Sequence, residues 1–242
     1  MSKPLLLLDG DQYLYKATVA CEREVRWDTD NHVLGSNASE AFDLCMGLIE
    51  KTTNTLNSNR IQIALSAGLN FRKEIAQSYK GNRVIVRKPL CYFEVMERLK
   101  KAYRCLGVDG LEADDLMGIW QTKDPTQDTI IVSEDKDMKT IPGKLYRQGV
   151  LADITEAEAN WNFLYQTLTG DSTDGYSGCP GVGPAGATKI LNADPSWASV
   201  VAAYEKAGLD ENDALVQARL ARILRVSDWD SVTRKPILWS PS

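Results

Sequence analysis

The chain has 242 residues, of which 43% are hydrophobic and 25% charged, and its formal net charge is −5. This composition is typical of a globular protein with one substantial core and excludes a disordered chain. No apolar stretch of membrane-spanning length and no signal peptide is found, so we expect no membrane partner. Five cysteines without a CxxC pair predict reduced thiols and a cytoplasmic location. The only histidine, His32, falls in an expected surface loop, which leaves histidine-dependent nucleophilic catalysis almost no basis.

Strands and helices alternate over the first part of the chain. Apolar and β-branched runs predict strands at 3–9, 60–66, 128–135 and 144–149. Helical spacing of apolar residues predicts helices at 10–20, 39–52, 89–107 and 112–121, the first with Asp11 as its N-cap. This order predicts an α/β fold with a mostly parallel central sheet flanked by helices.

The pattern becomes helical after Leu151. A helix is predicted at 155–170, followed by a turn rich in Gly, Ser and Asp, a glycine-rich stretch at 178–191, and two helical stretches that reach about residue 225. We expect residues 1–151 to form the α/β core and residues 152–242 a helical region, the two packed as one body.

Acidic residues gather where one edge of the predicted sheet should lie. In an open parallel sheet, ligands bind beyond the carboxyl ends of the strands, and four segments deliver carboxylates to that edge. The eight candidates are Asp9, Glu112, Asp114, Asp115, Asp135, Asp137, Asp171 and Asp174. Any one of them could serve only as a helix cap or turn residue. Together they would repel one another unless cations neutralise them, and ligands that offer only oxygen atoms favour Mg²⁺ or Mn²⁺.

A cluster of this kind is typical of phosphoryl chemistry, in which two ions about 4 Å apart stabilise the attacking and leaving oxygens. Without these eight carboxylates the formal charge of −5 becomes +3, so the remaining surface is mildly basic. A DNA partner is therefore compatible with the acidic total.

The stretch around Gly181 and Gly183 suits a helix-hairpin-helix. In this motif a glycine turn directs backbone N–H groups at a phosphate, and the next helix, which carries Lys189, adds its dipole. A plain turn between two helices is the alternative. A dinucleotide-binding loop is not favoured, because helical sequence rather than a strand precedes the glycines.

Residues 71–88 form a basic stretch with interleaved aromatic residues, a composition that suits a nucleic-acid strand. A solvated helix face is the alternative, but the stretch follows the second strand and so starts at the acidic edge. Its basic residues are Arg72, Lys73, Lys80, Arg83, Arg87 and Lys88.

Taken in order, the motifs LLLDGDQYLYK, FRKEIAQSYKGNR, LEADD, VSEDKDMKTI and GDSTDGYSGCPGVGPAGATKIL resemble the 5′-nuclease family. This family includes flap endonucleases, the 5′-nuclease domain of bacterial DNA polymerase I and phage 5′→3′ exonucleases. The resemblance spans about residues 5–191 and is greatest to exonucleases of short-tailed phages. It implies the PIN-like 5′-nuclease fold and a metal-dependent 5′→3′ exonuclease that acts on duplex DNA, with RNA–DNA hybrids and 5′ flaps as further substrates.

The resemblance also implies roles for residues of this chain. Two Mg²⁺ or Mn²⁺ ions are expected. The ligands nearer the reaction would be Asp9, Glu112, Asp114, Asp115 and Asp135, and the second set Asp137, Asp171 and Asp174. Lys16 would contact the scissile phosphate, and Lys80 and Arg83 would stand at the foot of a helical arch that spans about 80–104. The hairpin at 181–187 would bind duplex DNA together with K⁺, and Arg72, Arg87 and Lys88 would add DNA contacts. We expect a monomer, and Asp115→Asn is expected to abolish turnover without loss of the fold.

The chain departs from the family pattern at two positions. Cellular relatives carry an aspartate at the end of the second strand, where this sequence offers only Ser66, so we expect weaker binding of the first metal. Position 185 is Ala where Lys is frequent, which weakens the expected grip on duplex DNA.

Two alternatives from other classes remain. A non-catalytic DNA-binding protein would use the glycine hairpin while its acids are structural, and near-complete retention of the acids argues against it. A PIN-type ribonuclease would normally lack the hairpin and the basic YKGNR stretch.

Overall fold

The leucine-rich strand β1 (Leu5–Asp9) lies in the middle of the sheet because its side chains are buried on both faces. The structure is a computed structural model that describes residues 3–81 and 87–241. Within these ranges the main sheet has six strands in the order β5-β4-β1-β6-β7-β8. The other five are β4 (Arg60–Ala64), β5 (Cys105–Leu106), β6 (Thr129–Val132), β7 (Gly143–Arg147) and β8 (Val150–Ile154).

The first five strands in this order are parallel, and β8 alone is antiparallel, paired with β7 as a hairpin. The register pairs Leu8 of β1 with Ile63 of β4 on one side and with Val132 of β6 on the other. The carboxyl ends of the three central strands therefore meet at one edge. The predicted mostly parallel sheet flanked by helices is confirmed.

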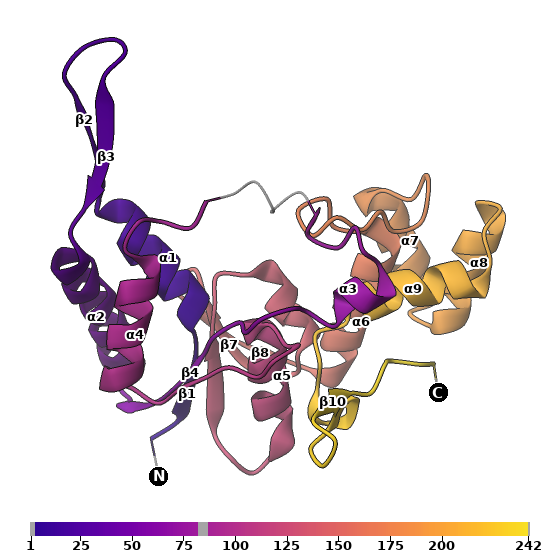
Figure 1. Ribbon diagram of the computed structural model, residues 1–242. Coiled ribbons are helices and arrows are strands. Elements are labelled where there is room, and N and C mark those ends of the chain that lie inside the picture. The colour runs from indigo at the N-terminus through magenta and orange to yellow at the C-terminus, as the bar shows by residue number, and fades with distance from the viewer. Residues whose placement is uncertain (1–2, 82–86, 242) are drawn as a thin grey trace.

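Helices cover both faces of the sheet (Figure 1). Leu6 and Leu8 point into a core shared with α1 (Gly10–Ala20), α2 (Ala38–Thr55) and α4 (Tyr92–Ala102). Leu7 points to the other face, where α5 (Ala113–Lys123) packs. The alternation along β1 thus divides one apolar run between two cores.

The helical half has a core of its own, with Tyr204 fully buried and its hydroxyl donating to the Thr167 carbonyl over 2.7 Å. It contacts the α/β half through α6 against η2 and through α9 against α3. Its helices are α6 (Glu156–Thr169), α7 (Pro184–Ala193), α8 (Trp197–Lys206) and α9 (Glu211–Ala221); the contacting elements are α3 (Arg72–Ile75) and the 3-10 turn η2 (Lys136–Thr140). A second 3-10 turn, η3 (Val226–Asp228), and a short hairpin of β9 (Trp229–Asp230) and β10 (Lys235–Pro236) follow.

A hairpin of β2 (Glu22–Arg26) and β3 (His32–Ser36) projects from the body (Figure 1). His32 therefore lies on a strand rather than in the expected loop. Nearly all residues of the hairpin are exposed, so it has no buried face to produce an alternating sequence pattern. None of the helices in the described ranges is long and apolar enough to cross a bilayer.

The segment expected to form an arch, 80–104, is divided by the structure. Residues 82–86, including Arg83, lie outside the described residues. Its C-terminal part is α4, whose residues Val95 and Leu99 are fully buried against α1 and α2. Because α4 belongs to the core, this part of the predicted arch is packed against the body of the protein.

Candidate active site

The end of β1 brings the first predicted carboxylate to the sheet edge. Asp9 is the N-cap of α1, where it accepts a hydrogen bond from the Gln12 backbone N–H over 3.2 Å. Its other oxygen accepts from the Ser133 hydroxyl, which follows β6, over 3.0 Å. Asp9, rather than the predicted Asp11, therefore caps the helix, and the cap fixes the carboxylate between two strand ends.

The segment after β6 supplies the next pair. Asp135 caps η2 and accepts from the Asp137 backbone N–H over 2.8 Å. Asp137 in turn accepts a 2.5 Å hydrogen bond from Gln166 of α6, so the helical half positions a carboxylate of the α/β half.

The loop after α6 carries Asp171 and Asp174 toward the same edge. An isolated bridge between Asp171 and Tyr176 closes this loop, and Asp171 forms a 3.0 Å ion pair with Lys136. Asp174 accepts from the Tyr79 hydroxyl over 3.2 Å, and its carbonyl accepts from the Lys80 backbone N–H over 2.7 Å. The turn thus docks on the basic stretch that follows α3.

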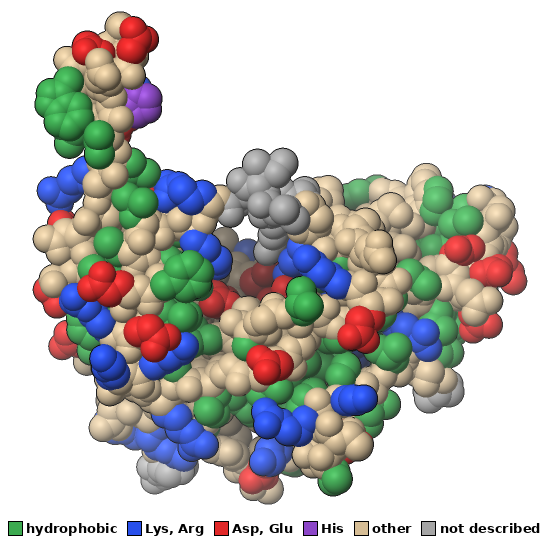
Figure 2. All heavy atoms as spheres, viewed as in Figure 1, with side chains coloured by type: hydrophobic (Ala, Val, Ile, Leu, Met, Phe, Trp, Pro, Cys, Tyr) green, Lys and Arg blue, Asp and Glu red, His purple; other side chains and the backbone are tan. Residues whose placement is uncertain are grey.

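These segments enclose a cavity of about 360 Å³ at the carboxyl ends of the central strands. Figure 2 shows acidic side chains in a hollow on this face with basic side chains beside it. Six carboxylates line the cavity, from Asp9, Asp11, Glu112, Asp114, Asp135 and Asp174, together with Lys16, Lys80 and Lys88. Glu112, Asp114, Asp135, Asp137 and Asp174 also line a smaller adjoining space.

Burial and mutual repulsion disturb the acids at the centre of this cluster. Burial, with the charges of Asp11 and Asp135, raises the pKa of Asp9 to about 6. Burial and the neighbouring Asp135 raise the pKa of Asp137 to about 7. The pKa of Asp114 is also raised, by burial and then by Asp9 and Asp135. Negative charge at these positions is not balanced by the protein, which is the condition under which a cation binds.

Protein cations already balance two other acids, Glu112 and Asp171. Burial alone would raise the pKa of Glu112, but Arg72 and Lys80 hold it below its usual value. The same holds for Asp171, where burial is outweighed by Lys136. The Lys80 ammonium lies between Glu112 and Asp174, 3.5 Å from the latter, in the position of a positive charge within the cluster.

Oxygen-only donors with unbalanced charge fit a hard divalent cation. No group of three His, Cys, Asp or Glu side chains in the described part of the chain is arranged to hold a metal ion as it stands. Three of the predicted ligands instead contact other side chains: Glu112 pairs with Lys80, Asp137 accepts from Gln166 and Asp171 pairs with Lys136.

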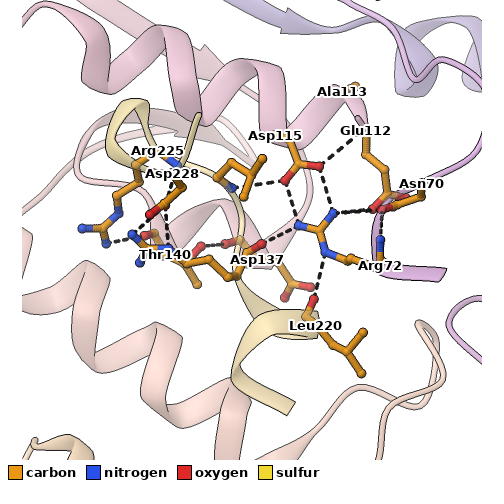
Figure 3. Close-up of polar contacts among 12 residues, drawn as sticks. Asn70, Arg72, Glu112, Ala113, Asp115, Asp137, Thr140, Leu220, Arg225 and Asp228 are labelled. Carbon is orange, nitrogen blue, oxygen red and sulfur yellow. Dashed lines mark hydrogen bonds and ion pairs between the residues drawn. The ribbon is translucent and has the colours of Figure 1, made fainter. Parts of the chain in front are cut away.

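Asp115 requires a correction. The sequence predicts it as a metal ligand, yet its side chain is fully buried and both oxygens are engaged (Figure 3). Arg72 donates to Asp115 Oδ1 over 2.7 Å and to Oδ2 over 2.8 Å, and the Leu224 backbone N–H donates to Oδ1 over 3.1 Å. Asp115 also accepts from the Glu112 backbone N–H over 3.2 Å. Asp115 is held against Arg72 and the Leu224 backbone N–H and does not line the cavity, so its role is structural.

The prediction that Arg72 contacts DNA is wrong for the same reason. Its side chain is 3% exposed, and the guanidinium also donates to the carbonyls of Leu220, over 3.0 Å, and Arg222 (Figure 3). Arg72 therefore joins α3, α5 and the end of α9. A basic residue in an exposed-looking stretch gives no sign in the sequence that its charge partner is Asp115, 43 positions away, or that its other acceptors are carbonyls near the end of α9.

Two other predicted DNA contacts are placed beside the cavity. Lys16 is exposed on α1 and lines the cavity, as does Lys88, whose ammonium lies 4.2 Å from the Tyr92 ring centre. Arg87 forms a bidentate ion pair with Glu22, at 2.6 and 2.9 Å, which connects the basic stretch to the base of the projecting hairpin.

The glycine stretch connects α6 to α7 through residues 170–183. Gly181 has a φ of +77°, a conformation that favours glycine, and Gly183 is the N-cap of α7 with Pro184 at the first helical position. A side chain added at either glycine would meet nothing within 4 Å. The turn is therefore open to a ligand, with Ala185 and Lys189 exposed on the helix that follows.

The sequence prediction missed Asp11, which lines the cavity. Ser66, at the end of the second strand, accepts a hydrogen bond from the Ala113 backbone N–H over 3.0 Å and so helps to place α5. The Ser66 backbone N–H donates over 3.0 Å to Asp11, a carboxylate that had been assigned only a capping role. The DGD repeat of Asp9 and Asp11 was the signal that could have found it.

Comparisons with known proteins identify the family of the chain. The sequence pattern of the family described as 5′-3′ exonuclease, N-terminal resolvase-like domain matches residues 4–158. The exonuclease of Escherichia phage T7 is 29% identical over 99% of this chain and 94% of its own length. The exodeoxyribonuclease of Enterobacteria phage T3 is 28% identical, over 99% of this chain and 93% of its own.

The fold is also similar to that of a solved protein. The T5 5′-exonuclease, in a structure with divalent zinc ions bound, superposes with a TM-score of 0.70 at 15% identity, covering 90% of this chain and 89% of that one. The resemblance inferred from the motifs is thereby confirmed. The chain belongs to the 5′-3′ exonuclease family and is a hydrolase, a nuclease of the 5′-3′ exonuclease type.

Proposed function

We propose that the protein is a divalent-metal-dependent 5′→3′ exodeoxyribonuclease that hydrolyses duplex DNA to 5′-phosphate products. The observation that carries the proposal is the cavity in which six carboxylates and three lysines meet at the ends of the central strands. The names of the phage T7 and T3 relatives, an exonuclease and an exodeoxyribonuclease, support the same reaction.

The acids that line the cavity and the space beside it are the residues we assign to metal binding. Asp9, Asp114 and Asp135 would hold the ion nearer the reaction, and Asp137 with Asp174 a second one, both Mg²⁺ or Mn²⁺. Such ions stabilise negative charge on the phosphate and lower the pKa of water at the site.

In this proposal the lysines bind phosphate groups rather than metal ions. Lys16 and Lys88 line the cavity mouth and would bind the phosphates of the strand to be cut. Lys80 is held among the acids, where its ammonium can exchange Glu112 for a phosphate oxygen once a metal ion occupies the cluster. Arg83, in the same stretch, would contribute from a position outside the described residues.

The open glycine turn would hold the duplex on one side of the cavity. Gly181 and Gly183 expose backbone N–H groups at the start of α7, an arrangement suited to a phosphate and a K⁺ ion, and Lys189 adds a positive charge. We further propose that the protein acts as a monomer in the cytoplasm, of the host cell if the protein is phage-encoded, in line with its five free thiols.

One experiment tests the reaction. Two duplexes, one labelled at the 5′ end and one at the 3′ end, are incubated with the protein in Mg²⁺ or in EDTA. We expect the 5′ label to be released at once as a 5′-phosphorylated product in Mg²⁺, the 3′ label to be released late, and no release in EDTA. Release in EDTA, or first release of the 3′ label, would contradict the proposal. The same assay with a 5′ flap and an RNA–DNA hybrid shows which 5′ ends are accepted.

A further inference from the structure

Asp11 lies in the first turn of α1 but does not cap the helix. In that turn the Gln12 backbone N–H donates to Asp9 instead. Asp11 Oδ2 instead accepts from the Ser66 backbone N–H over 3.0 Å, and Oδ1 accepts from the Tyr92 hydroxyl over 2.8 Å. The carboxylate is therefore held at the end of β4 by groups from two other elements, the β4 end and α4.

This position is inside the proposed active site. Asp11 lines the same cavity as Asp9, Asp114 and Asp135, at the edge where ligands of open parallel sheets bind. The charge of Asp11 raises the pKa of Asp9, and only the burial of Asp9 raises it more. Among the described residues no lysine or arginine forms an ion pair with Asp11. In the described part of the chain, Asp11 is thus a second carboxylate beside Asp9 that is held by neutral hydrogen-bond donors rather than by an ion pair.

A purely structural role leaves this arrangement unexplained. A neutral side chain such as Asn could keep both contacts without adding repulsion to the cluster, with its Oδ1 accepting from the Ser66 backbone N–H and its Nδ2 donating to the Tyr92 hydroxyl oxygen. The charge itself must therefore have a use. The Ser66 position at the end of β4 brings no carboxylate of its own, and Asp11 places one there from the neighbouring helix.

We propose that Asp11 supplies the negative charge at the end of β4 and so takes part in holding the divalent cation, with Ser66 and Tyr92 as its positioning partners. This inference rests on the proposed nuclease function. It adds a residue to the metal site and assigns the Ser66 backbone N–H and the Tyr92 hydroxyl to its support.

Mn²⁺ binding to the full chain without DNA tests the inference directly, measured by the electron paramagnetic resonance signal of free Mn²⁺. Asp11→Asn keeps the size of the side chain and one acceptor oxygen but removes the charge, and we expect the dissociation constant to rise about 10-fold. Asp30→Asn, at the exposed tip of the hairpin, changes the net charge equally and should leave binding unchanged. Tyr92→Phe keeps the charge but frees the carboxylate, so its effect should be smaller than that of Asp11→Asn.

A relocated carboxylate separates charge from structure. In Asp11→Asn with Ser66→Asp, the charge returns to the cavity from β4, and Mn²⁺ affinity should recover most of the loss. The Mg²⁺ concentration for half-maximal cleavage should shift in parallel, with the rate at saturating Mg²⁺ less affected. Wild-type affinity in Asp11→Asn, or a loss that the relocated carboxylate does not reverse, would overturn this inference alone. A wild-type protein that neither binds Mn²⁺ nor cleaves DNA would instead contradict the proposed function.

Discussion

Asp114 and Asp115 follow one another at the start of α5 but meet opposite electrostatic surroundings. Asp114 faces other carboxylates, and burial with that repulsion raises its pKa. Asp115 faces the Arg72 guanidinium at 2.7 Å and is fully buried. A buried charge that loses its partner is costly, whereas a charge removed from a repulsive cluster is a gain.

Substitution of the two aspartates should therefore have opposite effects on stability. In EDTA, Asp114→Asn should raise Tm by a few degrees and lower the cleavage rate in Mg²⁺ by at least about 100-fold. Asp115→Asn should cost about 3 kcal/mol, since it removes the bidentate charge partner of the buried Arg72 and leaves it only the longer ion pair with Glu112. For a chain of this length that is a fall in Tm of about 6–12 °C. Differential scanning calorimetry measures both values.

The activity of Asp115→Asn provides the control. Below its Tm the variant should retain Mg²⁺-dependent cleavage, because the metal cavity does not include this carboxylate. An inactive but fully stable Asp115→Asn would restore the expectation drawn from the sequence.

The metal-free protein should lose stability as the pH rises. Asp9 and Asp137 have folded-state pKa values of about 6 and about 7, above the ordinary 3.8, so the folded state binds more protons than the unfolded state between about pH 4 and 7. Stability is then highest at the acidic end of this window and falls until the higher pKa is passed. The lowered pKa of Glu112 acts only below its usual value, outside this window.

Thermal unfolding from pH 5 to pH 8 in EDTA checks this expectation, with a decreasing Tm as the predicted result. Addition of Mg²⁺ should reduce the decrease, and Asp137→Asn should reduce it without metal. A Tm that rises with pH in EDTA would show that the acids of the cavity are already balanced.

At the scale of elements, the turn before α7 can be tested without damage to the fold. Gly183 has a φ of −86°, and a side chain there would meet nothing within 4 Å, so Gly183→Leu should fold normally. The side chain would block close approach of a phosphate. We expect weaker duplex binding and a log–log salt slope smaller by about 0.9 for each lost contact.

The matched control is Gly47→Leu. Gly47 lies in α2, and a side chain added there would likewise meet nothing within 4 Å. Its duplex affinity and salt slope, measured by fluorescence anisotropy, should equal those of the wild type. Equal slopes for Gly183→Leu and wild type would mean that the turn is only a connection between helices.

Elements with a buried face could be predicted from the sequence, and those without one could not. The runs around Leu7 and Ile131 and the helical spacing in α6 follow directly from burial against a core. The β2–β3 hairpin is exposed on both faces and β8 is an edge strand, so neither has a regular apolar pattern.

Among the site residues, those placed by local structure could be predicted and those placed by long-range contacts could not. Acids at the ends of β1 and β6 could be predicted because strand direction places them. The roles of Asp115 and Arg72 depend on where residues 220–224 pass, a long-range contact that composition and spacing do not encode. Asp11 was missed because a helix start explains an aspartate well enough by itself.

At the scale of the whole molecule, negative charge is concentrated in one cavity, which six carboxylates line. A cation that fills the cavity binds only the folded state and should therefore stabilise the whole protein. At a Ca²⁺ or Mg²⁺ concentration of 100 times Kd, the gain is about 2.7 kcal/mol. This corresponds to a rise in Tm of about 5–11 °C.

Scanning calorimetry in EDTA and in the divalent ion gives the shift. The wild type and Asp30→Asn should rise equally, while Asp114→Asn should respond little, because it lacks a cavity carboxylate. An equal response of all three would indicate that the ion binds elsewhere.

The contact of Arg72 with the carbonyls of Leu220 and Arg222 also sets an order of events during synthesis. Arg72 and Asp115 are synthesised well before the backbone groups at 220–224 that complete their network. Until then α5, which carries Glu112 and Asp114 at its start, has no support from the end of α9. A nascent chain should therefore acquire its hydrolytic activity only after residues 220–224 have emerged, and truncation before Leu220 should leave it inactive.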